Sequence, residues 1–140
     1  MDSGDFVPIA ADEGLREVDR IREASGIDED QNIAYAEITS EGDSDELIAV
    51  SGYHSPEGTI PVPIERMFDT FDVDFDRSAD AEVKILEAVA KRIRDSGESG
   101  VVIRLFSERP PCDSCEGVIL QFRAEFSPEN VNLLVSHGER

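Results

Sequence analysis

The stretch that decides the fold runs from residue 101 to residue 126 and reads VVIRLFSERPPCDSCEGVILQFRAEF. Its first part, VVIRLF, is a continuous apolar run of the kind found in a buried central strand. A helix is expected to follow, because Val118, Ile119 and Phe122 recur at helical spacing. The sequence SPE after Phe126 breaks this helix. The stretch therefore predicts a buried strand followed by a core-facing helix.

The segments on either side of this stretch extend the pattern. VNLLVS, at residues 131–136, is expected to form a strand. Upstream, a helix is expected from about Ser78, which is available as a cap, to Arg94. One face of this helix is apolar and carries Ile85, Leu86, Val89 and Ile93. Two consecutive strand-helix-strand units favour parallel pairing with a right-handed crossover.

The segment from Asn32 onward predicts a pair of strands. NIAYAEI and LIAVSG are short β-prone runs, and EGDSDE between them indicates a hairpin. The proline-rich segment 53–68, YHSPEGTIPVPIERMF, should be an extended loop able to cover a site. The predicted order is strand, strand, helix, strand, helix, strand. This order predicts an α/β fold with a mixed sheet.

Length and composition indicate one domain. The chain has 140 residues, of which 39% are hydrophobic, enough for a single core. We assign residues 32–140 to this domain. Residues 1–31 are rich in Asp, Glu and Gly, and Leu15, Val18 and Ile21 recur at helical spacing. This segment is either a short helix or an acidic lead-in, with a poorly ordered linker as the alternative.

The charge balance is strongly acidic. The formal net charge is −19, and the sequence contains eleven Arg but only two Lys, Lys84 and Lys91. Such a surface repels nucleic acid at long range and suits a protein that lives in high salt. We expect a halophilic source, with an acidic protein from a GC-rich mesophile as the alternative. No apolar run of 18 residues and no signal peptide are present, so we expect a soluble protein without membrane contact.

Cys112 and Cys115 are the two cysteines of the chain, and they lie one helical turn apart at the start of a predicted helix. Two cysteines exclude a disulfide scaffold and indicate a metal or redox site. A thioredoxin-like site is one alternative, although only 25 residues follow Cys115. A structural Cys2His2 zinc site with His54 and His137 is another, although neither histidine lies at zinc-finger spacing.

A catalytic zinc site is the third possibility. Such a site needs three protein ligands and one open position for water. Asp80 fits as the third ligand beside Cys112 and Cys115, because Asp80-Ala81-Glu82 opens the helix preceding the central strand. Two helix N-termini would then converge on one metal ion. Glu82 would present a second carboxylate to it.

These motifs resemble those of the cytidine-deaminase-like superfamily. Its zinc deaminases carry H-x-E or C-x-E at one helix start and P-C-x-x-C at the next, and this chain has D-A-E and P-P-C-D-S-C. The segments RSADAEVKILEAVAKRI, GVVIRLFSERPPCDSCEGVILQFRAEF and VNLLVSHG resemble the deaminase domains at the C-terminal ends of bacterial polymorphic toxins. The resemblance covers about residues 32 to 138. Asp replaces the usual first ligand, and Asp-x-Glu is similar to the motif of this toxin-like branch.

The resemblance implies a three-layer α/β/α fold and a zinc-dependent hydrolase. Zinc would be held by Asp80, Cys112 and Cys115, and Glu82 would move the protons while water replaces the amino group of a base. Similar domains line the base and sugar pocket with the opening hairpin and the residues before P-C-x-x-C. The substrate-binding residues expected on this basis are Asn32, Tyr35, Ser51, Tyr53, His54, Ser107 and Glu108.

The resemblance further implies cytosine-to-uracil conversion in nucleic acid. DNA, single-stranded or duplex, is the expected substrate, and RNA is the alternative polymer. A deaminase of free nucleosides or nucleotides is the nearest alternative function, and a non-enzymatic zinc-stabilised interaction module is the alternative of another class. The resemblance also implies an immunity protein as partner. We expect a monomer that is cytoplasmic or is secreted and delivered as part of a larger toxin.

Overall fold

The computed structural model describes residues 7–27, 31–40, 43–51, 59–60, 81–96, 100–109, 113–126 and 131–138. Within these ranges, three helices and four strands alternate along the chain. Their order is α1 (Ala11–Ser25), β1 (Ile33–Ser40), β2 (Asp43–Val50), α2 (Ala81–Ser96), β3 (Val101–Ser107), α3 (Asp113–Glu125) and β4 (Val131–His137). From β1 onward, this is the predicted order of strands and helices.

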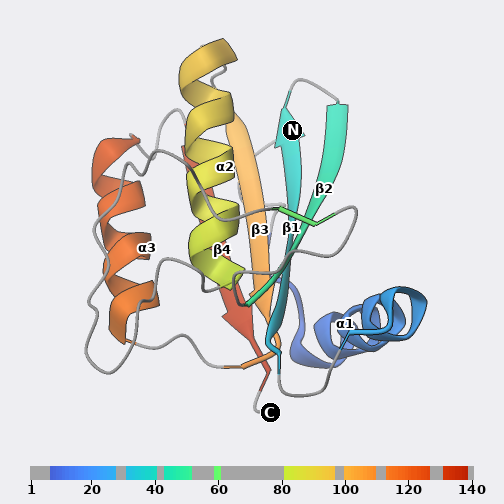
Figure 1. Cartoon of the computed structure of the whole chain (residues 1–140). Coiled ribbons are helices and arrows are strands. Elements are labelled where there is room, and N and C mark those ends of the chain that lie inside the picture. The colour runs from blue at the N-terminus through green and yellow to red at the C-terminus, as the bar shows by residue number, and fades with distance from the viewer. Residues whose placement is uncertain are drawn as a thin grey trace.

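The four strands form one mixed sheet in the order β2-β1-β3-β4 (Figure 1). β1 pairs antiparallel with β2 and also with β3, whereas β3 and β4 are parallel. The predicted hairpin is present. Of the two strand-helix-strand units expected to pair in parallel, only β3 and β4 do so, because β1 lies between β2 and β3. β1 and β3 are the central strands, so each has a hydrogen-bonded neighbour on both sides.

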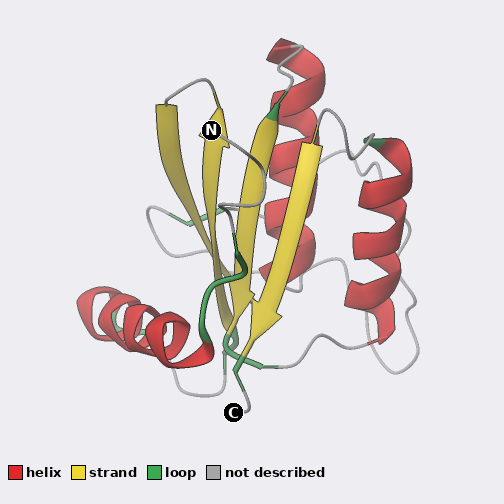
Figure 2. Cartoon of the chain, turned by 180° about the vertical axis from the view of Figure 1, so that it is seen from behind, coloured by secondary structure: helices red, strands yellow, loops and turns green. Residues whose placement is uncertain are grey.

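Helices cover both faces of the sheet. α2 and α3 lie on one face, and α1 lies on the other, as the two opposite views show (Figures 1 and 2). The alternation of side chains along each strand explains this division. Along β1, for example, Ala34 and Ala36 belong to the cluster beneath α2 and α3, while Ile33 and Tyr35 belong to the cluster beneath α1. The predicted three-layer α/β/α architecture is confirmed, and it is consistent with a cytidine-deaminase-like fold.

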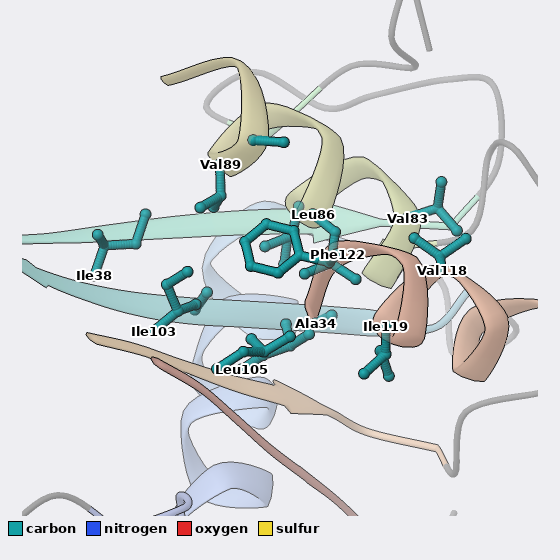
Figure 3. Packing of buried hydrophobic residues seen from close by; sticks show 14 of the residues in the cluster. Ala34, Ile38, Val83, Leu86, Val89, Ile103, Leu105, Val118, Ile119 and Phe122 are labelled. Atoms are coloured by element: carbon teal, nitrogen blue, oxygen red, sulfur yellow. The ribbon is translucent and has the colours of Figure 1, made fainter. Parts of the chain in front are cut away.

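The larger hydrophobic cluster joins α2 and α3 to the sheet (Figure 3). Leu86 of α2 and Phe122 of α3 pack together above Ile103 and Leu105 of β3. Val83 of α2 and Val118 of α3 belong to the same cluster. The N-terminal halves of α2 and α3 are therefore packed into one core.

The beginnings of α2 and α3 lie at the same end of the sheet as the carboxyl ends of β3 and β4 (Figures 1 and 2). β1 starts at this end too, because it runs antiparallel to β3. In open α/β sheets, binding sites form at the carboxyl ends of parallel strands. We refer to this end of the sheet, where β1 begins and β3 and β4 end, as the carboxyl edge.

The bounds of β2 and α2 differ from the prediction. β2 begins at Asp43, whereas the sequence indicated a strand beginning near Leu47. β2 is an edge strand, so its exposed residues Asp45 and Glu46 extend the ladder with β1 while staying in contact with water. α2 ends at Ser96 rather than near Arg94. Residues 78–80, where its start was predicted, lie outside the described residues, as does most of the proline-rich segment 53–68.

The helices of the described part of the chain were compared with membrane-spanning helices, and none is long and apolar enough to cross a membrane.

The first helix, α1, packs on the sheet. α1 is followed by Gly26, whose φ of 63° is in the left-handed region that favours glycine. Val18 and Ile21 of α1 are buried against the sheet, and Leu15 is partly buried there. The predicted boundary at residue 32 stays a prediction, but α1 packs directly against the following strands.

Candidate active site

Glu82 lies in the first turn of α2, and its side chain is 3% exposed. A carboxylate is favourable at this position because the N-terminal end of a helix carries a partial positive charge. Burial at the carboxyl edge, however, removes this polar group from water. A buried carboxylate needs hydrogen-bond donors to offset the loss of water.

Asn32 and Ser107 supply these donors. Nδ2 of Asn32 donates to Oε1 of Glu82 at 3.0 Å, and the hydroxyl of Ser107 donates to the same oxygen. Asn32 Nδ2 also donates to Ser107 Oγ at 3.0 Å. Asn32 directly precedes β1, and Ser107 ends β3. Three segments that are far apart in the sequence therefore fix one carboxylate at the carboxyl edge.

Ser51 connects the end of β2 to Asn32. Its hydroxyl accepts a hydrogen bond from the Asn32 backbone N–H at 2.9 Å, and its own N–H donates to the Asn32 carbonyl at 2.9 Å. The side chain of Gln31 donates to the Ser51 carbonyl at 3.0 Å. These contacts make Ser51 part of the support of Asn32. They also fix where the chain leaves β2 toward residues 52–58.

Glu108 immediately follows β3 and is 3% exposed. Its carboxylate receives two hydrogen bonds from the guanidinium group of Arg22, at 2.7 and 2.8 Å. Its backbone N–H donates to the Ile33 carbonyl at 3.0 Å. The predicted contact of Glu108 with substrate stays a prediction, and the structure shows its side chain bound to Arg22.

Lys84 is a fully buried lysine two residues after Glu82. Its ammonium group donates to the Val50 carbonyl at 2.6 Å. Burial disfavours the charged form and lowers the pKa of Lys84. This side chain ties the helix that carries Glu82 to the end of β2.

The proposed metal ligands are only partly within the described residues. Asp80 directly precedes α2 and Cys112 directly precedes α3, and both lie outside the described residues. Cys115 is the third residue of α3. Among the residues that the structure does describe, no three His, Cys, Asp or Glu side chains are grouped so that they could hold a metal ion. The helix starts adjoining Asp80 and Cys112 lie at the same edge of the sheet.

Of the remaining predicted residues, Tyr35 and His137 lie within the described structure. Tyr35 lies on the α1 side of the sheet, 2% exposed, with its ring 5.9 Å from that of Phe106. Burial and the nearby charge of Glu37 raise the pKa of Tyr35 well above its usual range. Tyr53 and His54 lie outside the described residues. His137 ends β4 in register with Ser107, and its Nδ1 lies 2.8 Å from the Gly138 carbonyl oxygen.

Arg22, Gln31 and Lys84 were not predicted from the sequence. Arg22 continues the apolar spacing of Leu15 and Val18 along α1, so a charged residue stands where an apolar one is expected. Lys84 likewise stands within the apolar run of α2 and is one of two lysines in the chain. Arg22 and Lys84 could therefore have been found in the sequence as charged residues at positions where the helical pattern expects buried apolar ones.

Comparison with known protein families identifies the family of the chain. The sequence model of the Toxin-deaminase family, described as the BURPS668_1122 family of deaminases, matches residues 60–137. The match includes α2, β3, α3 and β4, with Glu82 and both cysteines. No match was found among curated proteins or among solved structures. Because the family match covers more than half of the chain, the protein belongs to the Toxin-deaminase family and is a hydrolytic deaminase of the toxin type.

Proposed function

We propose that the protein is a zinc-dependent hydrolase that converts cytosine to uracil in nucleic acid, with DNA as the favoured polymer. The observation that carries the proposal is the buried Glu82 carboxylate, held by Asn32 and Ser107 beside the start of the cysteine-bearing helix α3. Family membership supports deamination. Zinc, the base and the polymer are inferred from the residues and from the toxin type of the family.

The proposed zinc ligands are Asp80, Cys112 and Cys115. Two thiolates and a carboxylate are a suitable donor set for zinc and leave one position open. The order of the chain supports this set, because two of the three residues directly precede helices that begin at the carboxyl edge, and the third lies in the first turn of α3. When bound, zinc supplies Lewis acidity that makes water easier to deprotonate at neutral pH.

Glu82 is assigned the proton transfers. Its carboxylate takes one proton from the attacking water and delivers it to the ring nitrogen N3. It then takes the second proton from the hydroxyl formed on C4 and delivers it to the departing amino group. The water oxygen forms a bond to C4 of cytosine, the bond between C4 and the amino nitrogen breaks, and ammonia leaves. Asn32 and Ser107 fix Oε1 of Glu82, so the carboxylate keeps one orientation during these transfers.

Nucleic acid as substrate is supported by the toxin type of the family. We propose further that the domain is delivered as part of a larger toxin and is neutralised by an immunity protein. The net charge of −19 repels a polyanion at low ionic strength, and salt screens this repulsion. Assays for activity on DNA therefore need to include molar salt.

The test incubates the purified protein, with zinc, with single-stranded and duplex oligonucleotides at low and at molar salt. Sequencing then reports C-to-T changes, and A-to-G changes would report adenine deamination instead. Glu82→Gln should retain zinc and lower the rate by about a hundredfold or more, as expected for loss of a proton-transfer group. Glu13→Gln is the matched control, because Glu13 is an exposed carboxylate in the first turn of α1.

Three outcomes would overturn parts of the proposal. Conversion of free cytidine without conversion of oligonucleotides would favour a nucleoside deaminase. Stoichiometric zinc with no conversion of any base would favour a zinc-stabilised interaction module. A protein without stoichiometric zinc that still converts cytosine would remove the metal from the proposal.

A further inference from the structure

Arg22 of α1 forms the most buried ion pair among the described residues. The side chains of Arg22 and Glu108 are 15% and 3% exposed, and the guanidinium group binds both carboxylate oxygens, at 2.7 and 2.8 Å. Two parallel hydrogen bonds fix orientation as well as distance. The pair joins α1, on one face of the sheet, to the segment that leads from β3 to Cys112.

The same guanidinium group also binds a second segment of the site. Nη2 of Arg22 donates to the Gln31 carbonyl at 2.9 Å, and Gln31 directly precedes Asn32. The two segments held by Arg22 also contact each other, because the Glu108 N–H donates to the Ile33 carbonyl at 3.0 Å. One side chain thus ties together the segments that deliver Asn32 and Ser107 to Glu82.

The end of β4 approaches the same point. The Gly138 N–H donates to the Ser107 carbonyl at 2.9 Å. A Cβ atom at Gly138 would lie 2.8 Å from the Glu108 carbonyl oxygen, so only glycine permits this approach without a shift. The backbone around Ser107 and Glu108 is therefore held by β1, β4 and α1 together.

Stability alone does not explain Arg22. A buried ion pair contributes little net stability compared with well-packed apolar side chains of similar size. α1 already buries Val18 and Ile21 against the sheet, and an apolar residue at position 22 would extend that contact. What the ion pair adds is a defined position for the Glu108 backbone.

We propose that Arg22 is a positioning residue of the deaminase, which acts through Glu108 and Gln31 to hold Ser107 and Asn32 in place around Glu82. The inference rests on the proposed function for its effect on catalysis. It makes α1, which lies outside the residues matched by the family, a working part of the catalytic unit. The contacts shown for Arg22 are with Glu108 and Gln31, the residues next to Ser107 and Asn32.

The central experiment compares Arg22→Met with Arg20→Met, using turnover of the best oligonucleotide substrate and amide hydrogen exchange. Arg20 is an exposed arginine on the same helix, paired with Glu17, so Arg20→Met controls for loss of one positive charge. We expect Arg22→Met to lower kcat by about tenfold or more with a smaller change in KM, because small misplacement of catalytic groups slows the chemical step. Exchange of the Glu108 amide should rise, while exchange of the Leu134 amide in β4 stays unchanged.

A second set of variants separates positioning from stability. Arg22→Met leaves the Glu108 charge buried without its arginine, which can weaken the fold. The double variant Arg22→Met with Glu108→Gln removes that charge, so its free energy of unfolding should recover while kcat stays low. Arg22→Lys should restore activity only in part, because an ammonium group cannot make the two parallel hydrogen bonds.

Wild-type kcat and wild-type Glu108 exchange in Arg22→Met would overturn the inference. An equal rise in exchange at Glu108 and Leu134, or recovery of kcat together with stability in the double variant, would also overturn it by showing a purely structural role. If the wild-type protein converts no base, the proposed function fails. The exchange comparison would still decide whether Arg22 holds the two segments.

Discussion

At the scale of single residues, the candidate site includes a small set of hydrogen bonds among Glu82, Asn32 and Ser107. The hydroxyl of Ser107 has one hydrogen, which it donates to Glu82, and it accepts from Asn32. The amide of Asn32 donates to both partners. Each of these side chains therefore supports the other two, and removing one loosens the Glu82 carboxylate.

Ser107→Ala tests this arrangement directly. The substitution removes one donor to Glu82 Oε1, and a hydrogen bond to a charged group contributes about 1.5–3 kcal/mol. Since Asn32 still binds Oε1, we expect kcat for deamination to fall by about tenfold. Ser44→Ala, at an exposed position of β2, is the matched control. Steady-state kinetics measure this change. A wild-type kcat in Ser107→Ala would show that the hydroxyl does not hold the Glu82 carboxylate.

Lys84→Met tests the cost of the buried ammonium group. Because the folded-state pKa of Lys84 is lowered, the unfolded chain binds more protons as the pH approaches the ordinary pKa of 10.5. Wild-type stability should therefore rise relative to Lys84→Met between pH 7 and pH 10. Urea unfolding at several pH values measures this difference. Lys91→Met, at an exposed lysine of the same helix, should show no such relative change.

Tyr35→Phe is needed in the same experiment, because titration of Tyr35 changes the free energy of unfolding with pH in the opposite direction to titration of Lys84. Its folded-state pKa is raised, so the unfolded chain loses the phenol proton first and stability falls as the pH rises above about 10. In the Tyr35→Phe background, the protein with Lys84 should still gain stability with pH relative to the protein with Met at residue 84. If this relative gain disappears, Lys84 is not the group that causes the rise in stability.

At the scale of secondary-structure elements, the hydrophobic patterns predicted the strands and helices. They could do so because apolar residues recur at one spacing along the buried face of a helix and at another along the buried face of a strand. The stripe of α2, with Ile85, Leu86, Val89 and Ile93, is buried as expected. Patterns were less informative for β2, whose charged first residues Asp43 and Asp45 indicated a turn. Asp45 instead pairs with Arg92 of α2 at 2.7 Å, a contact between residues 47 apart that no local pattern contains.

Gly14→Ala tests the packing of α1 on the sheet. A Cβ atom at residue 14 would lie 2.4 Å from the ring of Phe106, which is fully buried. Ala favours a helix over Gly by about 1 kcal/mol, whereas overpacking a core costs about 1–3 kcal/mol. We expect a net loss of stability in urea unfolding. Ala24→Gly, at an exposed site of α1, measures the propensity effect separately; a stabilised Gly14→Ala protein would contradict close packing of α1.

At the scale of the whole molecule, the net charge of −19 gives a prediction about salt. Screening lengths fall from about 10 Å at 0.1 M to about 3 Å at 1 M salt, so the repulsion between carboxylates should weaken strongly over this range. If the protein is halophilic, its Tm should continue to rise with NaCl into the molar range. A plateau below about 0.5 M would favour an acidic mesophilic protein, and a Tm that does not rise would exclude repulsion as a major destabilising effect.

The sequence by itself determined the order of strands and helices after residue 32, the mixed sheet, the apolar faces of α2 and α3, and the motif that includes Glu82. These features are local, because hydrophobic spacing and helix-start residues can be read within about twenty positions. Only the tertiary structure decided the strand order β2-β1-β3-β4, the contact of Glu82 with Asn32 and Ser107, and the attachment of α1 through Arg22. Such contacts join residues 25 to 86 positions apart, and their partners are selected by the packing of the sheet rather than by any pattern along the chain.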